Sequence, residues 1–351
     1  MLKLDAFTEH RPGAVRITTK SLDSLPPSAV PNAPRVSTPI QQRIDEFRHQ
    51  DRIRAAALII SVFGDAVVPR GGRIWLGSLI RLLETLGLND RLVRTSVFRL
   101  ARDEWLQSEP CGRRTNYLLT PSGLQRIDEV SRLVYASATP QWDRRWRLIV
   151  SVGELAAKDR ERLRKALFWQ GFGILNGDCF VHPSANLISA FDTLVAEGLG
   201  EFLHKLKPLL AADAAPGTAA SDAEMVRNAW NLEHLAQTYR RFAERYQPAL
   251  TQLRDGAGDL SDEDAFLLRV LLIHDYRRLL LRDPALPDVL LPSNWPGHKA
   301  RQLCRELYRR LLPASERHLD NYLQLADGHA PEASARLLER FQDADPLFDE
   351  M

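Results

Sequence analysis

The sequence predicts an α+β multidomain protein, and three patterns along the chain indicate this class. Two helix-like segments separated by a glycine precede a pair of short strands near residue 110. A strand, a helix and a hairpin follow between residues 146 and 182. Beyond residue 222 apolar residues recur at helical spacing. The 351 residues, 44% of them hydrophobic, suffice for two or three domains.

Residues 1–40 hold six prolines and no helical pattern of apolar residues, so we expect a flexible N-terminal arm. Four of its basic residues could reach a DNA minor groove, although the composition favours a dispensable tail. These four are Arg11, Arg16, Lys20 and Arg35. From Gln41 to Phe63 the sequence predicts a first helix, basic at its start and apolar at its end.

The next segment has the pattern of a helix-turn-helix. Residues 74–86 carry an apolar stripe, Gly87 interrupts it, and a strongly basic helix is predicted from Asn89. On a helical wheel, Val97 and Leu100 lie within about 40° of Val93, so these three residues form a packing face. The opposite face, here called the outer face, carries Arg91, Thr95, Phe98 and Arg102, flanked by Arg94 and Arg99.

Two short strands are predicted after the basic helix, at Trp105–Glu109 and Asn116–Thr120. The hairpin between them carries Arg113 and Arg114. A hairpin tipped with arginines beside a basic helix is the pattern of a winged helix. The helix expected at Pro121–Leu133 either links this domain to the next one or packs within it.

Positive charge is concentrated in this part of the chain. Between residues 51 and 147 there are sixteen arginines and no lysine against ten acidic residues, a net charge of +6, whereas the rest of the chain sums to −4. A local positive field is expected where one module meets phosphates. We therefore predict a winged helix-turn-helix DNA-binding domain over residues 41–138. The alternative is an ordinary solvated face of arginines.

A second domain is predicted over residues 139–212. Apolar and polar residues alternate over 146–152 as in a half-buried strand, and a helix is expected over 158–170. Asn176 and Gly177 lie between two apolar runs, which is a strong hairpin signal. Strand, helix and hairpin indicate part of a ferredoxin-like unit whose remaining strands the sequence does not reveal. Residues 211–221 are expected to be a linker.

A helical C-terminal domain is predicted over residues 222–351. The expected helices are Val226–Leu250, Ala265–Leu281, Gly297–Leu312, Ala314–Leu325 and a weaker one at Pro331–Phe341. The second of these is apolar nearly all round, which predicts a central helix enclosed by others.

Composition argues against several classes of protein. Cys111, Cys179 and Cys304 lie far apart, with no CxxC pair, so neither a disulfide scaffold nor a zinc site is expected. The first residues lack the apolar core of a signal peptide, and no stretch reaches the roughly 20 apolar residues of a membrane span. We expect a cytoplasmic protein that has no metal site and does not act on membranes.

Four blocks of sequence carry a resemblance to a known family. They are VFGDAVVPRGGRIWLGSLIRLLETLGLNDRLVRTSVFRLARDEWLQSEPCGRRTNYLLT, WDRRWRLIVSV, GFGILNGDCFVHP and IHDYRRLLLRDPALPDVLLPSNWPGHKARQL. Together they resemble the PaaX family of phenylacetic acid degradation repressors, from about Ile53 to Leu325.

The resemblance implies a winged-helix N-terminal domain, a central domain similar to the CRISPR-associated Cas2 fold, and a helical C-terminal domain. It also implies a homodimer, with the Cas2-like domain as the expected dimerisation domain. Such proteins repress phenylacetate catabolic genes and are released from their double-stranded DNA operators by phenylacetyl-coenzyme A. The acyl-coenzyme A is an effector ligand, and no cofactor is implied.

The DNA-binding hypothesis assigns separate tasks to the outer face and the hairpin. Arg91, Arg94 and Thr95 are predicted to read base edges, because early residues of a recognition helix usually reach them. Arg99 and Arg102 are predicted to hold phosphates, and Arg113 and Arg114 to contact DNA from the wing. Phe98 is expected to pack under the wing, the alternative being contact with a thymine methyl group.

An effector site is predicted where aromatic and cationic side chains cluster late in the chain. An acyl-coenzyme A combines an aromatic tail, an adenine and phosphates, so its pocket needs stacking surfaces beside cations. The candidates are His274, Tyr276, Arg277, Arg278, Arg282, Trp295 and Lys299. The alternative is a structural His and Tyr in a helical core with exposed arginines.

Two other functions are compatible with the sequence. The helical domain could recruit a protein partner in place of a small molecule. A Cas2-like domain could also be a metal-dependent nuclease, but this needs clustered carboxylates. The predicted strand ends in Ser151, Val152, Gly153 and Glu154 without an aspartate, and no GxSxG, HExxH or phosphate-binding loop is present. We expect no catalytic residues.

Overall fold

The computed structural model describes residues 37–136, 139–211, 221–256, 259–338 and 340–341. Most of the predicted arm lies outside these residues. Helix α1 (Pro39–Arg48) begins inside the range predicted for the arm. The Thr38 side chain accepts a hydrogen bond from the backbone N–H of Gln41, and the Gln41 side chain accepts one from the backbone N–H of Thr38. This capping box fixes the start of the helix.

The single helix predicted from Gln41 to Phe63 is wrong, because the structure has two helices there. After α1 the chain leaves the helical conformation and restarts as α2 (Ala55–Val62), followed by a π-helical turn at Phe63–Val67 and a 3-10 turn at Val68–Arg70. The two helices pack on different partners: α1 lies against α9 (Leu232–Arg254) and α10 (Asp262–Leu280), whereas α2 lies against α4 (Asp90–Arg102) and α10. One straight helix could not contact both sets of partners.

The predicted helix, glycine turn and basic helix are all present. Helix α3 (Leu76–Glu84) is followed by Gly87, whose φ of 84° is readily adopted by a residue without a side chain. Helix α4 (Asp90–Arg102) then begins after Asn89. A short strand before α3, β1 (Arg73–Trp75), was not predicted. It pairs with a strand far along the chain, a contact that no local pattern announces.

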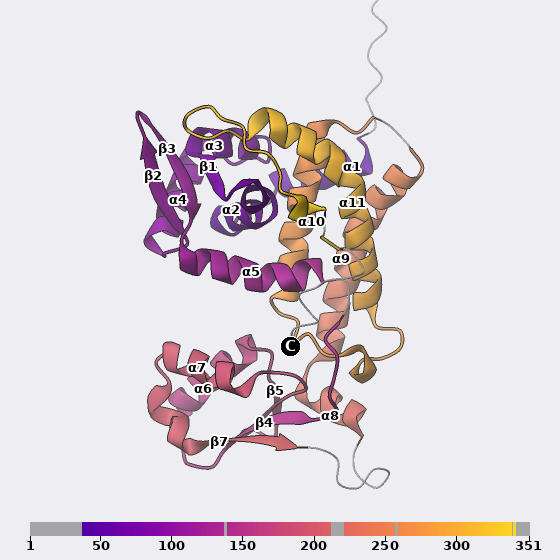
Figure 1. The fold of residues 1–351 in the computed structure, drawn as a ribbon. Helices are drawn as coiled ribbons and strands as arrows, with labels where there is room; N and C mark the ends of the chain where they lie inside the picture. The colour runs from indigo at the N-terminus through magenta and orange to yellow at the C-terminus, as the bar shows by residue number, and fades with distance from the viewer. Residues whose placement is uncertain (1–36, 137–138, 212–220, 257–258, 339, 342–351) are drawn as a thin grey trace, which may run out of the picture. The chain divides into compact units, whose positions relative to one another are not determined.

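The predicted hairpin is present and longer than expected. Strands β2 (Leu106–Cys111) and β3 (Arg114–Leu119) pair along their full lengths, leaving only Gly112 and Arg113 at the tip. With β1 they form a three-stranded antiparallel sheet in the order β1-β3-β2. Helix α5 (Pro121–Tyr135) follows, capped by Thr120. It contacts α10, so it packs on the C-terminal helices as well as on its own part of the chain (Figure 1).

The central part of the chain, residues 139–211, forms a four-stranded antiparallel sheet. Its elements are β4 (Trp146–Ser151), α6 (Ala157–Trp169), β5 (Gly173–Leu175), β6 (Cys179–His182), α7 (Leu187–Ala196) and β7 (Leu206–Ala211). The strand order β5-β6-β4-β7 and the βαββαβ sequence of elements are those of a ferredoxin-like unit. The Asn-Gly hairpin is confirmed, with positive φ at both residues. The strand that the sequence did not reveal is β7, which lies at an edge of the sheet.

The helix predicted from Val226 to Leu250 is also wrong, because it is interrupted at Trp230. Helix α8 (Asp222–Ala229) ends there in extended backbone, and α9 (Leu232–Arg254) begins two residues later. The Trp230 indole donates a hydrogen bond to the carbonyl of Gly171 at 3.0 Å, and the ring lies against Gly173. The interruption therefore places α8 against the central sheet.

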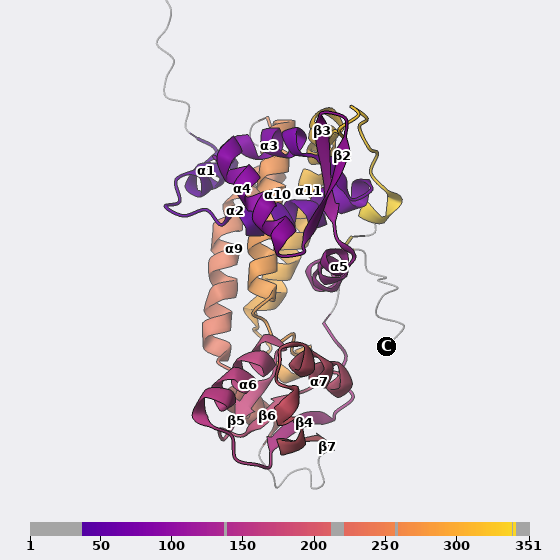
Figure 2. The same ribbon diagram turned by 90° about the vertical axis from the view of Figure 1, so that its left-hand side faces the viewer.

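The central helix is confirmed. Helix α10 (Asp262–Leu280) is buried along most of its length and lies beside α11 (Pro296–Tyr322) and α9 (Figures 1 and 2). The two helices predicted on either side of Pro313 are one, because the buried stripe continues through the proline. The weak helix predicted at Pro331–Phe341 is wrong: among its described residues only Ala335–Leu337 form a 3-10 turn.

One hydrophobic core joins two regions that the sequence assigns to separate domains. It contains residues of α1–α5 together with residues of α9–α11. The sheet of the central part has its own core against α6 and α7. The N-terminal part, residues 37–136, is thus held on the helical C-terminal part, residues 221–341, by continuous packing.

Candidate nucleic-acid interface

The packing face predicted for α4 is confirmed. Val93, Val97 and Leu100 are buried, together with Ser96. The N-terminus of the helix is fixed by Asn89, whose side-chain oxygen accepts a hydrogen bond from the backbone N–H of Leu92 at 2.9 Å. Because this face is held in the core, the rotation of α4 about its axis is set. All residues of the outer face are consequently exposed.

Two of the outer-face arginines have acidic neighbours on the same surface. Arg94 pairs with Asp90 at 2.7 Å and Arg102 with Asp103 at 3.0 Å, and all four side chains are more than half exposed. Exposed pairs of this kind contribute little stability and exchange readily with other ions. Arg91 and Arg99 make no ion pair within the residues that the structure describes. The outer face therefore keeps cationic groups that an anionic surface can reach.

Thr95 and Phe98 complete the outer face. The Thr95 hydroxyl donates to the carbonyl of Arg91 at 2.8 Å and still has acceptor capacity facing outward. Phe98 does not pack under the wing as predicted, because its side chain is 70% exposed. The hairpin contacts α4 through β2. Phe98 lies on the exposed side of the helix, away from the buried Val93 and Val97.

The two arginines of the hairpin have different surroundings. Arg113 lies in the two-residue tip and is exposed. Arg114 stacks its guanidinium on the ring of Trp75 at 4.4 Å and donates a hydrogen bond to the carbonyl of Ala326. Trp75 is half-buried, and Arg81 lies over the same ring. Among the described residues, Arg113 is therefore the arginine of the hairpin that has no ring or ion-pair partner, whereas Arg114 connects the hairpin to the C-terminal part.

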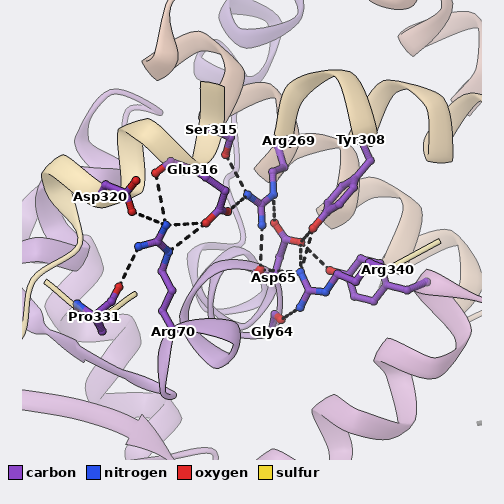
Figure 3. A network of polar contacts seen from close by, with 11 residues as sticks. Gly64, Asp65, Arg70, Arg269, Tyr308, Ser315, Glu316, Asp320, Pro331 and Arg340 are labelled. Atoms are coloured by element: carbon purple, nitrogen blue, oxygen red, sulfur yellow. Dashed lines mark hydrogen bonds and ion pairs between the residues drawn. The ribbon is translucent and has the colours of Figure 1, made fainter. Parts of the chain in front are cut away.

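A buried ion network holds the π-helical turn against α10 and α11 (Figure 3). The Asp65 carboxylate, which is 1% exposed, lies 2.8 Å from the fully buried Arg269 and 3.0 Å from Arg340. Burial alone would raise the pKa of Asp65, but the guanidinium groups of Arg269 and Arg340 outweigh it and hold the pKa below its usual value. Tyr135 and Tyr308 donate hydrogen bonds to the same carboxylate.

The network extends beyond Asp65 through a second carboxylate. Glu316 of α11 accepts from Arg269 and, at 2.6 Å, from Arg70. Arg70 also pairs with Asp320 at 2.7 Å and donates to the carbonyl of Pro331 (Figure 3). Arg70 belongs to the N-terminal part, whereas all its partners belong to the C-terminal part. The N-terminal part is thus fixed to the C-terminal helices by charge as well as by apolar packing.

Three of the predicted effector residues connect α10 to its neighbours. The Nδ1 atom of His274 lies 3.0 Å from the Ser61 hydroxyl, and burial lowers the pKa of this imidazole to about 4. Arg277 donates to the carbonyl of Ala57 at 3.1 Å. Tyr276 is buried, with its ring 5.3 Å from that of Phe242. These contacts fit a structural role.

The other four predicted effector residues do not surround a common pocket. Arg278, Arg282 and Lys299 are exposed, whereas Trp295 is buried with its ring 5.9 Å from that of Tyr239. Among the seven predicted residues only Trp295 lines the apolar pocket beside α11. The structure therefore does not assemble the predicted set around one ligand-sized space.

That pocket was missed by sequence reasoning. Its cavity volume is about 60 Å³, and its wall includes Leu133 of α5, Tyr239 of α9, Leu280 of α10 and Arg301 of α11. The Tyr239 hydroxyl donates to the carboxylate of Asp283, and burial raises the pKa of that carboxyl. The lining residues come from four helices and from the two segments that follow α5 and α10, so no local motif announces them.

Comparisons with known proteins identify the family. Family models match three successive segments: "PaaX-like protein" over residues 54–123, "PaaX protein central Cas2-like domain" over 139–206 and "PaaX-like protein C-terminal domain" over 230–321. The transcriptional repressor PaaX of Escherichia coli (strain K12) is 36% identical over 292 residues, which cover 82% of this chain and 90% of that protein. The chain belongs to the PaaX family.

Membership of the PaaX family confirms the resemblance noted in the sequence and the Cas2-like identity of the central domain. The Escherichia coli relative is a transcriptional repressor, which supports a non-enzymatic regulator. Among solved structures, uncharacterized protein Rv0674 from Mycobacterium tuberculosis is similar, with a TM-score of 0.48 and 22% identity over 74% of this chain and 96% of that one.

Two further findings concern what the described residues of this PaaX-family chain lack. They contain no group of three or more His, Cys, Asp or Glu side chains placed to hold a metal ion. Within the same residues, no helix combines the length and apolar character that crossing a membrane requires.

Proposed function

We propose that this chain is a DNA-binding repressor of phenylacetate catabolic genes in which α2–α4 and the β2–β3 hairpin act as a winged helix. The observation that carries the proposal is the outer face of α4, where exposed arginines are turned outward by a buried packing face. Helix α4 would enter the major groove, which admits a helix and presents a distinct pattern for each base pair.

The position of each arginine along α4 supports the division of tasks. Arg91, Arg94 and Thr95 lie in the first half of the helix and are proposed to read base edges. Arg99 and Arg102 lie in the second half and are proposed to bind phosphates. Arg113 is proposed to contact the backbone from the wing tip. The ion pair between Arg94 and Asp90 would be exchanged for the contact with DNA.

The first test is the Arg94→Ala variant. Duplexes covering the intergenic DNA beside the gene for this chain would be titrated at one fixed salt concentration. Loss of a bidentate arginine contact should weaken specific binding by roughly 1 to 3 kcal/mol. Arg241→Ala is the matched control, because it removes an exposed arginine from α9, outside the proposed winged helix. Unchanged operator affinity of Arg94→Ala would remove the assignment of this residue.

We further propose that an acyl-coenzyme A, most simply phenylacetyl-coenzyme A, releases the protein from its operator. The acyl end would enter the apolar pocket lined by Leu133, Tyr239 and Trp295 rather than the scattered set predicted from the sequence. An engineered cavity that binds benzene measures about 150 Å³, so a pocket of about 60 Å³ must widen to accept an aromatic ring. Widening would displace α5, which follows the wing directly. A ligand that prefers the widened state shifts the equilibrium toward it.

The test of the effector combines calorimetry with operator release. Phenylacetyl-coenzyme A and a panel of other acyl thioesters would be added to the full chain and to its complex with DNA. Leu133→Trp enlarges a side chain of the pocket wall and should raise the thioester concentration needed for release. Leu124→Trp is the control, since Leu124 is equally exposed on the same helix and does not line this pocket. No heat with any thioester would favour control by a protein partner.

A homodimer is proposed as the form that binds DNA, by analogy with other repressors whose two-fold symmetry matches paired half-sites. Sedimentation equilibrium of the full chain at micromolar concentration tests this directly. A monomer under those conditions, with a single protected half-site in footprinting, would contradict it.

A further inference from the structure

The outer face of α4 carries one large exposed hydrophobic side chain, that of Phe98. Its side chain is 70% exposed, more than any other aromatic side chain in the part of the chain that the structure describes. The next most exposed aromatic residue, Trp169, contacts the neighbouring ring of Phe168. Among the described residues no aromatic ring and no guanidinium group lies against Phe98. A single exposed apolar side chain is common on protein surfaces, but Phe98 lies among the exposed arginines of the outer face, where its position bears on the proposed DNA contact.

The surroundings of Phe98 restrict what it can bind. One turn before it lie Arg94 and Thr95, and one turn after it lies Arg102, all exposed. No other large hydrophobic side chain of α4 is exposed. A single apolar ring among cations does not form the contiguous apolar patch that a protein partner uses. It fits a surface on which anionic groups border one small apolar target.

We propose that Phe98 contacts the C5-methyl group of a thymine in the operator and thereby selects a T·A pair at one position of each half-site. The major groove of DNA offers this chemistry, because phosphates border it and the thymine methyl is its apolar group. This inference rests on the proposed function, since it requires α4 to lie in the major groove. It adds a specificity determinant that carries no charge and makes no hydrogen bond.

The spacing along α4 places the thymine relative to the other bases. Phe98 follows Arg94 by four residues, which is about 6 Å along the helix axis. Successive base pairs are about 3.4 Å apart, so the thymine lies about two base pairs from the base that Arg94 reads. Both contacts belong to the same half-site.

The experiment replaces thymine by uracil, which lacks only the methyl group. The full chain would first select its preferred duplex from a random pool, and each thymine of that duplex would then be replaced singly. For the wild-type chain we expect about fourfold weaker binding at one thymine of each half-site, the equivalent of burying one methyl group. The Phe98→Ala variant should bind the thymine duplex correspondingly weakly and show no response to uracil at that position.

The outcomes separate this inference from the proposed function. If the wild-type chain selects a sequence but no uracil substitution weakens binding, the thymine contact is wrong while the repressor proposal stands. If Phe98→Ala weakens binding to selected and random duplexes alike, the ring serves packing and not readout, and the inference is again overturned. If no sequence is selected at all, the proposed function itself fails. The uracil scan uses the unaltered chain, so it can overturn the inference even if Phe98→Ala folds poorly, whereas the assignment of the contact to Phe98 requires the response of the variant.

Discussion

The imidazole of His274 lies between α10 and α2, where its Nδ1 atom is 3.0 Å from the Ser61 hydroxyl. The residues alone slightly favoured a core residue over a ligand contact at this position, and only the family resemblance made the two interpretations equal. The 4% exposed side chain of His274 and its contact with Ser61 favour the core residue. Arg277 lies about one turn further along α10 and donates a hydrogen bond to the carbonyl of Ala57.

The burial of His274 predicts how the stability of the folded chain depends on pH. Burial lowers the pKa of His274 in the folded state to about 4, whereas an exposed histidine titrates near 6.5. Between these values the unfolded chain binds a proton that the folded chain excludes. The contribution of His274 to the free energy of unfolding is therefore fully present above pH 6.5. This contribution is lost as the pH falls toward 4, and the loss for this one group reaches about 3 kcal/mol. His182, whose pKa burial also lowers to about 4, adds a contribution of the same sign.

Urea unfolding of the wild type and of His274→Gln at several pH values measures this effect. We expect the variant to lose less stability between pH 6.5 and pH 4.5 than the wild type does. His234→Gln removes an exposed imidazole and should leave the profile unchanged. Parallel profiles for the wild type and His274→Gln would show that His274 does not couple folding to protonation.

At the scale of elements, the β2–β3 hairpin shows how two neighbouring arginines come to differ. Side chains alternate between the two faces of a strand, and Arg114 is the first residue of β3. Its guanidinium is therefore directed to the face that carries Trp75, at a distance of 4.4 Å. Arg113 lies outside the strand pairing, and no aromatic ring of the described residues lies under its guanidinium. We therefore expect Arg114 to stabilise the hairpin and Arg113 to be available to phosphate.

This difference predicts unequal effects of two charge-equivalent substitutions. Arg113→Ala should lower affinity for all DNA sequences and reduce the salt slope of binding by about 1, because one phosphate contact is lost. Arg114→Ala should have a smaller effect on the salt slope and a larger one on the thermal stability of the hairpin. Binding isotherms at four salt concentrations, together with thermal unfolding, measure both. A larger change of slope for Arg114→Ala would reverse the assignment.

At the scale of the whole molecule, the N-terminal and C-terminal parts share a core and a buried ion network. Asp65 contributes the carboxylate that faces Arg269 and Arg340, and the latter two come from residues more than 200 positions along the chain. Removing one partner of a buried pair leaves an uncompensated charge, which usually costs far more than the pair itself contributes. The network therefore ties the stability of the N-terminal part to that of the helices.

We predict that Asp65→Ala lowers the free energy of unfolding by about 3 to 5 kcal/mol. The loss should appear in one transition that includes both the N-terminal and the C-terminal parts, since they share one core. Urea unfolding followed by tryptophan fluorescence and by circular dichroism measures it.

The matched control is Asp90→Ala, which removes a carboxylate paired with Arg94 at the surface. Exposed pairs contribute at most about 1 kcal/mol, so its effect should be small. Equal losses for the two variants, or separate transitions for the two parts, would show that the buried network does not couple them.

Several features of the fold were within reach of the sequence because they depend on neighbouring residues. The two faces of α4 follow from helical periodicity, and its start follows from the side chain of Asn89. The hairpin at Asn176 and Gly177 follows from a local preference for positive φ. The family itself was evident from sequence blocks spread along the chain. The DNA-binding residues assigned from these patterns are exposed, and their roles stay predictions.

Other features depended on contacts between distant segments, which only the tertiary structure decided. Strands β1 and β7 owe their existence to pairing partners elsewhere in the chain. The break at Trp230 reflects the Gly171 carbonyl of the central domain, 59 residues away. The exposure of Phe98 and the burial of His274 likewise depend on which helix faces meet. A sequence determines the faces of each helix through local periodicity, whereas the partner of each face is selected by packing of the whole chain.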